Sequence, residues 1–247
     1  MIRHIPNFIT SLNLLSGCLA LVFVFKGDIP VFSLFVGVCL VLDFLDGFAA
    51  RMLKAHSPMG KELDSLADMV AFGIVPGAIL YHLFLISPPL NLVNGSFWIP
   101  VVSYFPFIVT VFSGLRLAKF NIDTRQTTSF LGLPTPAVTI FVTGLALILQ
   151  YDRFNLTPFL LNSFVIGGIA MILSFLLVSE IPLFAMKFRS FDWPQNKSQY
   201  LMLMISIVLL ITLQFAGIPL LVLFYIILSL LNNQFRLNRE KPNTANQ

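Results

Sequence analysis

Apolar runs of helical length recur along the whole chain, and short polar or turn-forming stretches separate them. A membrane-spanning helix needs about 20 predominantly apolar residues. Measured against that length, the pattern predicts about eight helices, near residues 6–26, 29–50, 64–86, 96–120, 133–150, 158–180, 198–215 and 217–233. The expected fold class is therefore an all-α polytopic membrane protein.

Turn-forming residues support these divisions. Gly27, Asp28 and Pro30 separate the first two helices, and a Pro-, Asn- and Gly-containing stretch over 87–95 follows the third. Gly132 and Pro134 precede the fifth helix. Only a tight break at 216–219 divides the last pair, so this hairpin is the least well defined of the predicted elements.

Composition agrees with a membrane protein. Of the 247 residues 57% are hydrophobic and 11% charged, and the mean hydropathy is +0.89, far from the values of a soluble domain. We expect one transmembrane domain over residues 1–235 and a polar cytoplasmic tail over 236–247. Cys18 and Cys39 lie in apolar segments without metal-ligand spacing, so we interpret them as packing residues.

The distribution of basic residues predicts the orientation in the membrane. An even number of crossings puts both termini on one side, and Lys and Arg concentrate in cytoplasmic loops. With the N-terminus inside, all of the fifteen basic residues except Lys26 and Arg153 fall on the cytoplasmic side. We therefore expect an inner-membrane protein with cytoplasmic termini. The net charge of +4 reflects this topology and contact with anionic lipids, and no nucleic-acid partner is expected.

Four aspartates interrupt the second and third apolar segments. Asp43 and Asp46 are three residues apart, and Asp64 and Asp68 are four apart, so each pair lies on one face of its helix. A short connecting loop, expected over 51–63, makes the two helices antiparallel neighbours. The four carboxylates are therefore predicted to converge at the cytoplasmic end of this helix pair.

Capping and salt bridging are the simpler explanations for these acids. Asp64 could cap a helix start, and basic residues lie nearby in the loop. Capping does not explain Asp43 and Asp46, because the helix dipole disfavours negative charge near a C-terminal end. Carboxylates at membrane depth usually mark function, and four together repel one another unless cations are bound.

The chemistry expected here is metal-assisted phosphoryl transfer. Aspartate oxygens suit hard cations, so we expect two Mg²⁺ or Mn²⁺ ions, with Ca²⁺ possible in one site. Two such ions, roughly 3.5–4 Å apart, can orient a pyrophosphate. Gly47, Ala50 and Gly60 leave room for a phosphate donor, and Arg51 can hold its oxygens. Taken alone, each small residue would be read as a packing contact.

The stretch from Asp43 to Asp68 reads D-x2-D-G-x2-A-R-x8-G-x3-D-x3-D. It resembles the signature of the CDP-alcohol phosphotransferase family, whose members transfer a phosphatidyl group from a CDP-linked lipid to an alcohol. The resemblance implies a catalytic six-helix core with two additional C-terminal helices, and a homodimer. It also implies roles for the residues of the signature: metal ligands at Asp43, Asp46, Asp64 and Asp68, with Asp68 also the catalytic base, and a CDP pocket at Gly47, Ala50, Arg51 and Gly60. Ser57 is a further candidate for nucleotide contact.

Other segments concern the acceptor alcohol. Residues 5–13, 62–68, 115–121 and 132–137 resemble the membrane-embedded bacterial phosphatidylserine synthases of this family, which implies CDP-diacylglycerol and L-serine as substrates. Lys119 departs from the resemblance, because arginine is the more familiar residue there. A serine carboxylate requires a nearby cation, and Arg116 and Lys119 could supply it, with Asn121 as a hydrogen-bonding partner. Arg125 is interpreted as an ordinary cytoplasmic charge.

Alternative functions fit less well. Choline lacks a carboxylate and would leave Arg116 and Lys119 without a role, whereas glycerol phosphate or inositol phosphate would need more basic residues near the site. A divalent-cation transporter should carry polar residues through the whole membrane, but these acids collect at one level, beside Arg51.

Overall fold

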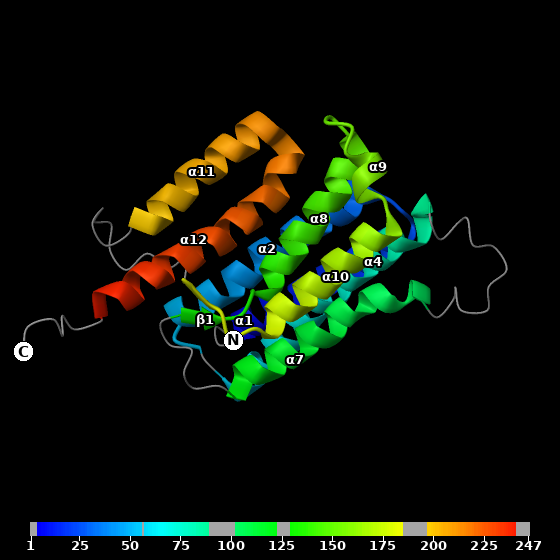
Figure 1. Cartoon of the computed structure of the whole chain (residues 1–247). Coiled ribbons are helices and arrows are strands. Elements are labelled where there is room, and N and C mark those ends of the chain that lie inside the picture. Colours follow the sequence, from blue (N-terminus) through cyan, green and yellow to red (C-terminus); the bar gives the residue numbers. More distant parts are fainter. Residues whose placement is uncertain (1–3, 56, 89–101, 123–128, 185–196, 241–247) are drawn as a thin grey trace, which may run out of the picture.

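The computed structural model describes residues 4–55, 57–88, 102–122, 129–184 and 197–240, and shows a bundle of long helices (Figure 1). One continuous run comprises α3 (Pro58–Asp68), the π-helix η2 (Met69–Ile74) and α4 (Val75–Ile86). The other long helices are α1 (Ile5–Phe25), α2 (Ile29–Met52), α7 (Ile108–Ile122), α8 (Thr135–Tyr151), α10 (Ser163–Val178), α11 (Lys197–Leu213) and α12 (Gly217–Glu240).

Length and hydropathy confirm the expected membrane fold. Within the described part of the chain, five stretches are long and apolar enough to cross a membrane: Ile5–Phe25, Ile29–Met52, Pro58–Ile86, Phe105–Ile122 and Gln199–Leu231. The helices α8 and α10 are apolar but shorter. The last stretch contains both α11 and α12, which pack against each other as the predicted hairpin (Figure 1). Its turn is the 3-10 helix η5 (Gln214–Ala216), where Gln214 has a φ of 51°.

The third helix begins at Pro58, six residues before the predicted start. Ser57 caps it, because its Oγ accepts a hydrogen bond from the Gly60 backbone N–H at 3.0 Å. Pro58 fits the first helical position, where no N–H is needed. The predicted loop over 51–63 was therefore too long, and Gly60 lies in the first turn of α3 rather than in a loop.

Other predicted boundaries also moved. The expected helix over 158–180 is divided into α9 (Thr157–Leu160) and α10, because the Asn162 side chain accepts a hydrogen bond from Phe164 N (2.9 Å) and starts a new helix. The short helix η3 (Phe105–Phe107) precedes α7, and residues 96–101 of that predicted helix lie outside the described residues. Helix α12 continues to Glu240, beyond the expected end at 233, and residues 241–247 of the predicted tail lie outside the described part.

A short antiparallel ladder was not predicted. β1 (Ser129–Leu131) pairs with β2 (Pro182–Phe184) in the register Ser129↔Phe184, Phe130↔Leu183 and Leu131↔Pro182. Directly after β1, the backbone N–H of Gly132 donates to Ile181 O at 3.0 Å, and that of Leu133 donates to Leu176 O at 2.9 Å. The ladder therefore ties the start of α8 to the end of α10.

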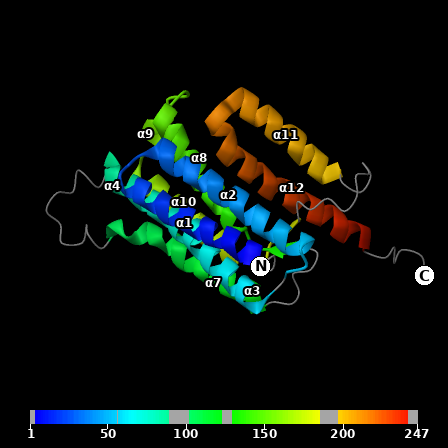
Figure 2. The same cartoon turned by 180° about the vertical axis from the view of Figure 1, so that it is seen from behind.

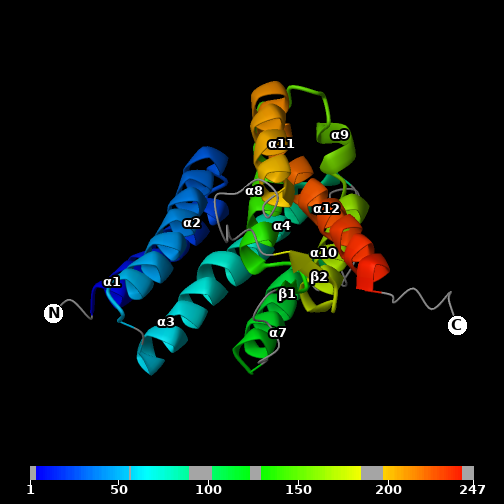
Figure 3. The same ribbon diagram turned by 90° about the vertical axis from the view of Figure 1, so that its left-hand side faces the viewer.

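The core lies between two groups of helices. α8 packs against α2, α4 and α12, and α4 also packs against α1 and α10. In Figure 3, α1 and α2 lie on one side and the α11–α12 hairpin on the other. The buried side chains of this core include Val75, Leu80, Val138, Val142 and Val222. Large apolar side chains on the outer faces, such as Phe8 and Phe44, remain exposed, as contact with lipid acyl chains requires.

Candidate active site and metal centre

Three helix ends form the site. The start of α1, the last turns of α2 and the start of α3 meet at one end of the bundle (Figure 2), where α1 packs against both other helices. α2 runs antiparallel to α1 and α3 because the connections between them are short. The two aspartate pairs are therefore carried to the same end, as the sequence predicted.

Three of the four aspartates form a compact group. Asp43, Asp64 and Asp68 each place a carboxylate oxygen within 4.8 Å of the others. Oδ1 of Asp68 is buried and has no hydrogen-bond partner among the described residues. Such a group of carboxylate oxygens suits a hard divalent cation, which would also give Asp68 Oδ1 the partner that it lacks. The residues present thus suit Mg²⁺ or Mn²⁺.

Asp46 lies outside this group of three. It is buried, and its Oδ2 accepts a hydrogen bond of 2.7 Å from Oγ1 of Thr10 on α1. It lines a cavity together with Asp64, so Asp64 belongs both to the group of three and to the cavity wall. The four carboxylates therefore form two sets that share Asp64, an arrangement compatible with two neighbouring ions.

A cavity of about 540 Å³ opens beside the carboxylates, within the usual size range of ligand pockets. Its wall contains all five residues that were predicted to contact CDP, namely Gly47, Ala50, Arg51, Ser57 and Gly60. Besides Asp46 and Asp64, the wall also contains six residues that the sequence did not assign to the pocket: Pro6, Asn7, Thr10, Ala55, Pro58 and Lys61. Arg51 and Lys61 give this cavity two cationic side chains beside the acids.

Close packing explains why Gly60 carries no side chain. A Cβ atom at this position would lie 2.9 Å from Oδ1 of Asn7 and 3.0 Å from the Ser57 hydroxyl. Both neighbours line the cavity, so a larger residue would push polar groups into the pocket. At Gly47, a Cβ would instead meet Nη1 of Arg51 at 3.4 Å, an ordinary contact with a movable side chain.

The π-helix η2 begins immediately after Asp68. A π-turn leaves backbone carbonyls without their usual α-helical partners, and such turns concentrate at functional sites. Two threonines from other helices bond these carbonyls. Thr110 Oγ1 on α7 donates to Gly73 O (2.9 Å), and Thr139 Oγ1 on α8 contacts Phe72 O (3.3 Å) as well as Thr135 O (3.1 Å). These hydroxyls hold the segment that follows the catalytic candidate.

Replacement of Thr139 by valine tests this support. One buried hydrogen bond contributes about 1 kcal/mol, so we expect a loss of about that size in stability. We also expect a lower kcat, because the segment that follows Asp68 is held less firmly. Thermal unfolding in detergent and turnover would measure both. Thr143→Val is the matched control, because the Thr143 hydroxyl is buried on the same helix with no partner in the described structure. Equal effects of the two substitutions would contradict the supporting role of Thr139.

The three predicted acceptor residues do not share one pocket. Arg116 is buried, 7% exposed, and close enough to Asp68 for their charges to interact. Lys119 is half-exposed and forms an ion pair with Glu180 at 3.3 Å. Asn121 Nδ2 donates to Ser65 Oγ at 2.9 Å. Asn121 is five residues from Arg116 and therefore lies on a different face of α7, where it joins this helix to α3.

A small hollow adjoins Arg116 and Lys119, and Ser179 is also in its wall. Tyr225, a buried residue of α12, is a near neighbour of Arg116. No sequence signal links Tyr225 to the site, because the residue lies far along the chain in an ordinary apolar helix. Arg125, interpreted above as an ordinary cytoplasmic charge, lies outside the described residues.

Comparison with known proteins decides the family. The family profile described as CDP-alcohol phosphatidyltransferase matches residues 3–179, which include the aspartates, the cavity wall and Arg116. The chain belongs to the CDP-alcohol phosphatidyltransferase family. This membership confirms the family expected from the aspartate signature, and with it a transferase. The helices α11 and α12 of this phosphatidyltransferase lie outside the matched region.

Several curated relatives carry the name CDP-diacylglycerol–serine O-phosphatidyltransferase. The protein from Bacillus subtilis is 35% identical over 179 residues, which cover 72% of this chain and 89% of the relative. That from Mycobacterium tuberculosis is 32% identical over 214 residues, 83% of this chain and 69% of the relative. That from Methanocaldococcus jannaschii is 31% identical over 178 residues, 72% of each chain.

Proposed function

We propose that this phosphatidyltransferase moves the phosphatidyl group of CDP-diacylglycerol to the hydroxyl of L-serine, giving phosphatidylserine and CMP. The names of the relatives favour serine. The observation that carries the proposal is the position of Arg116. This cationic side chain is buried, 7% exposed, and its charge interacts with that of Asp68. A buried guanidinium there can pair with the carboxylate of the acceptor.

The proposed reaction is a direct displacement. The Asp68 carboxylate takes the proton of the serine hydroxyl while the serine oxygen bonds to the phosphorus of the phosphatidyl group. The bond from that phosphorus to the oxygen of CMP breaks, and CMP leaves with the electron pair. The proton on Asp68 then passes to solvent. No covalent enzyme intermediate is needed.

The other three aspartates are suited to act as metal ligands. Asp43, Asp46 and Asp64, together with Asp68, would hold two divalent ions, Mg²⁺ or Mn²⁺, with Ca²⁺ possible in one site. Such ions, when bound, offset the negative charge that develops on the pyrophosphate oxygens. Arg51 and Lys61 on the cavity wall would bind the same oxygens from the protein side. The backbone near Gly47 and Gly60 leaves space for the nucleotide.

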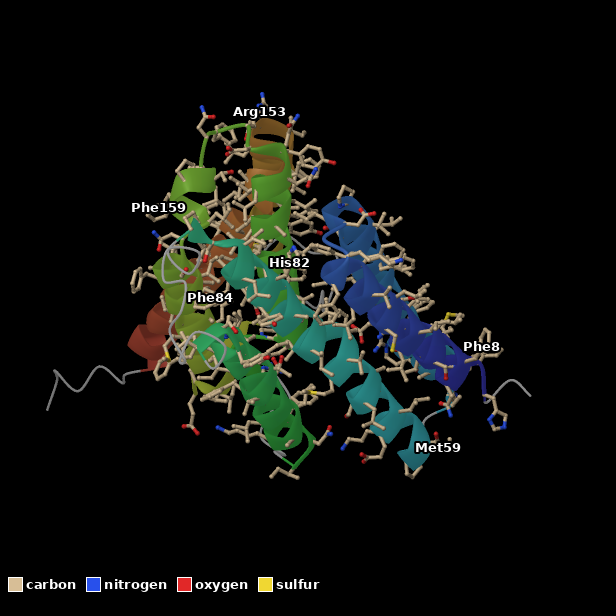
Figure 4. The ribbon with its side chains drawn as sticks, turned by 90° about the vertical axis from the view of Figure 1, so that its right-hand side faces the viewer. Phe8, Met59, His82, Phe84, Arg153 and Phe159 are labelled. Atoms are coloured by element: carbon tan, nitrogen blue, oxygen red, sulfur yellow. The ribbon has the colours of Figure 1, made fainter. Side chains whose placement is uncertain are left out.

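The distribution of charge supports a cytoplasmic site. Figure 4 shows Arg153 at one end of the bundle and Phe8 and Met59 at the other, where the aspartates lie. Most of the described basic residues occupy the site end, which supports a cytoplasmic position for the site and both termini under the positive-inside rule. Residues 1–235 would then form one catalytic transmembrane domain in the inner membrane. The homodimer that the family resemblance implies stays a prediction.

An acceptor panel tests the proposal. Purified protein in detergent micelles receives CDP-diacylglycerol and Mn²⁺ or Mg²⁺, and CMP release is followed with L-serine, choline, glycerol 3-phosphate or myo-inositol phosphate. We expect release with serine. Arg116→Gln should raise the KM for serine more than about tenfold, because the serine carboxylate loses one charged hydrogen-bonding partner. The KM for the donor should change little. Arg153→Gln, at the far end of the bundle, is the matched control. Release with another acceptor would overturn the serine assignment.

A further inference from the structure

Asn13 is a buried polar residue that the proposed mechanism leaves unexplained. It lies on α1 with 0% exposure, and neither its Oδ1 nor its Nδ2 has a hydrogen-bond partner in the described structure. An unpaired buried polar group costs about 1–3 kcal/mol. Buried side-chain amides almost always have hydrogen-bond partners. An amide whose oxygen and nitrogen both lack one therefore indicates a ligand that bonds to it.

Contacts one turn away on either side show where Asn13 faces. Thr10, Asn13 and Gly17 lie on one face of α1, because they are spaced at three and four residues. Thr10 donates a hydrogen bond to Asp46. A Cβ on Gly17 would lie 3.1 Å from the Cα of Ala71, so this part of α1 touches the run that carries the second aspartate pair.

At the level of Asn13, α1 also contacts α2, the helix that carries Asp43 and Asp46. The Cys39 Sγ–H donates to the backbone O of Asn13 at 3.7 Å. Cys39 precedes Asp43 by one helical turn, and Ala71 follows Asp68 by three residues. Along α1, Asn13 therefore lies between the Thr10–Asp46 bond and the Gly17–Ala71 contact, at about the level of Asp43 and Asp68.

A second unpaired oxygen lies at this depth. Oδ1 of Asp68 is buried and has no partner, like both polar atoms of Asn13. We propose that Asn13 supplies a further oxygen ligand, its Oδ1, to the divalent cation held by Asp43, Asp64 and Asp68. This inference rests on the metal-dependent function proposed above.

The chemistry of the amide suits this position. A fifth carboxylate would add to the repulsion among four existing ones, whereas a carboxamide oxygen coordinates a hard cation without adding charge. Nδ2 of Asn13 would then donate to a neighbouring carboxylate oxygen and help fix its orientation. Mg²⁺ and Mn²⁺ accept about six oxygens, so positions remain for the phosphate groups of the donor.

Mn²⁺ binding to the full-length protein in micelles, without any substrate, provides the test. Free Mn²⁺ is measured by electron paramagnetic resonance during titration, and the thermal unfolding of the metal-free protein is followed in parallel. The variants are Asn13→Leu, which removes both polar atoms at similar size, and Asn13→Asp, which keeps an oxygen. Asp43→Asn serves as the control for the metal centre itself, and Thr143→Val as the control for a buried polar group elsewhere.

We expect Asn13→Leu to weaken Mn²⁺ binding about tenfold or more, while the stability of the metal-free protein stays the same or rises because an unpaired amide is gone. Asn13→Asp should retain binding within about threefold. Mn²⁺ affinity that is unchanged in Asn13→Leu but reduced in Asp43→Asn would overturn the role of Asn13 alone. If Asp43→Asn also binds Mn²⁺ normally, the proposed metal centre fails as well.

Discussion

Asp68→Asn is expected to reduce serine-dependent CMP release by a factor of about 10²–10⁴, the usual contribution of a general base. The amide has the size of the carboxylate but cannot take the proton of the acceptor hydroxyl. CMP release in micelles at saturating serine would measure the loss, and thermal unfolding would show that the protein remains folded.

Glu62→Gln is the matched control for this experiment. Glu62 lies on the same helix, but its side chain is exposed and lines no part of the cavity described above. Its neutralisation should change CMP release by less than about twofold. If Asp68→Asn kept more than a tenth of the wild-type rate, Asp68 would not be the base, and Asp64 would become the residue to test.

The largest effect on stability is expected from Gly132→Ala. Gly132 has a φ of 75°, a conformation that costs an L-residue about 1–3 kcal/mol. The new Cβ would also lie 2.5 Å from Leu177 O and 2.9 Å from Ser179 O, both backbone atoms that cannot turn away. We expect a loss of about 2–4 kcal/mol, seen as a lower unfolding midpoint in detergent.

Gly168→Ala provides the comparison for that loss. Gly168 lies on α10, and a Cβ there meets nothing within 4 Å. Helix propensity alone should then stabilise the protein by up to about 1 kcal/mol. A Gly132→Ala variant as stable as Gly168→Ala would show that the junction between β1 and α8 relaxes more easily than its contacts suggest.

Local patterns carried most of the sequence-based prediction. Apolar runs of helical length identified the long helices. Of the four aspartates that the spacing was expected to bring together, Asp43, Asp64 and Asp68 form one group, and Asp46 lies outside it. The small residues of the signature do line one cavity. These features depend on residues close in sequence, where helical periodicity fixes which side chains share a face.

Features that depend on distant residues were not predicted. The bond between Thr10 and Asp46 joins two helices whose relative height no local pattern determines. The ladder of β1 and β2 pairs two three-residue segments that are too short to give a strand pattern. Asn121 was assigned to the acceptor because of its position near Arg116 in sequence, yet its side chain bonds Ser65 on another helix.

The π-helix also has a geometric consequence for the long run from Pro58 to Ile86. Each residue advances an α-helix by about 100°, so a widened turn resets the phase between the segments on its two sides. Before it, Asp64 and Asp68 lie close to Asp43 of α2. Gly73, near the end of η2, lies against Ser113 of α7, and Gly77, after η2, lies against Thr110. Deleting one residue from η2 would restore a regular helix and rotate the acidic half away from its partners while the packed half stayed in place. The widened turn therefore allows one continuous helix to direct its aspartates towards the site and its glycines towards α7.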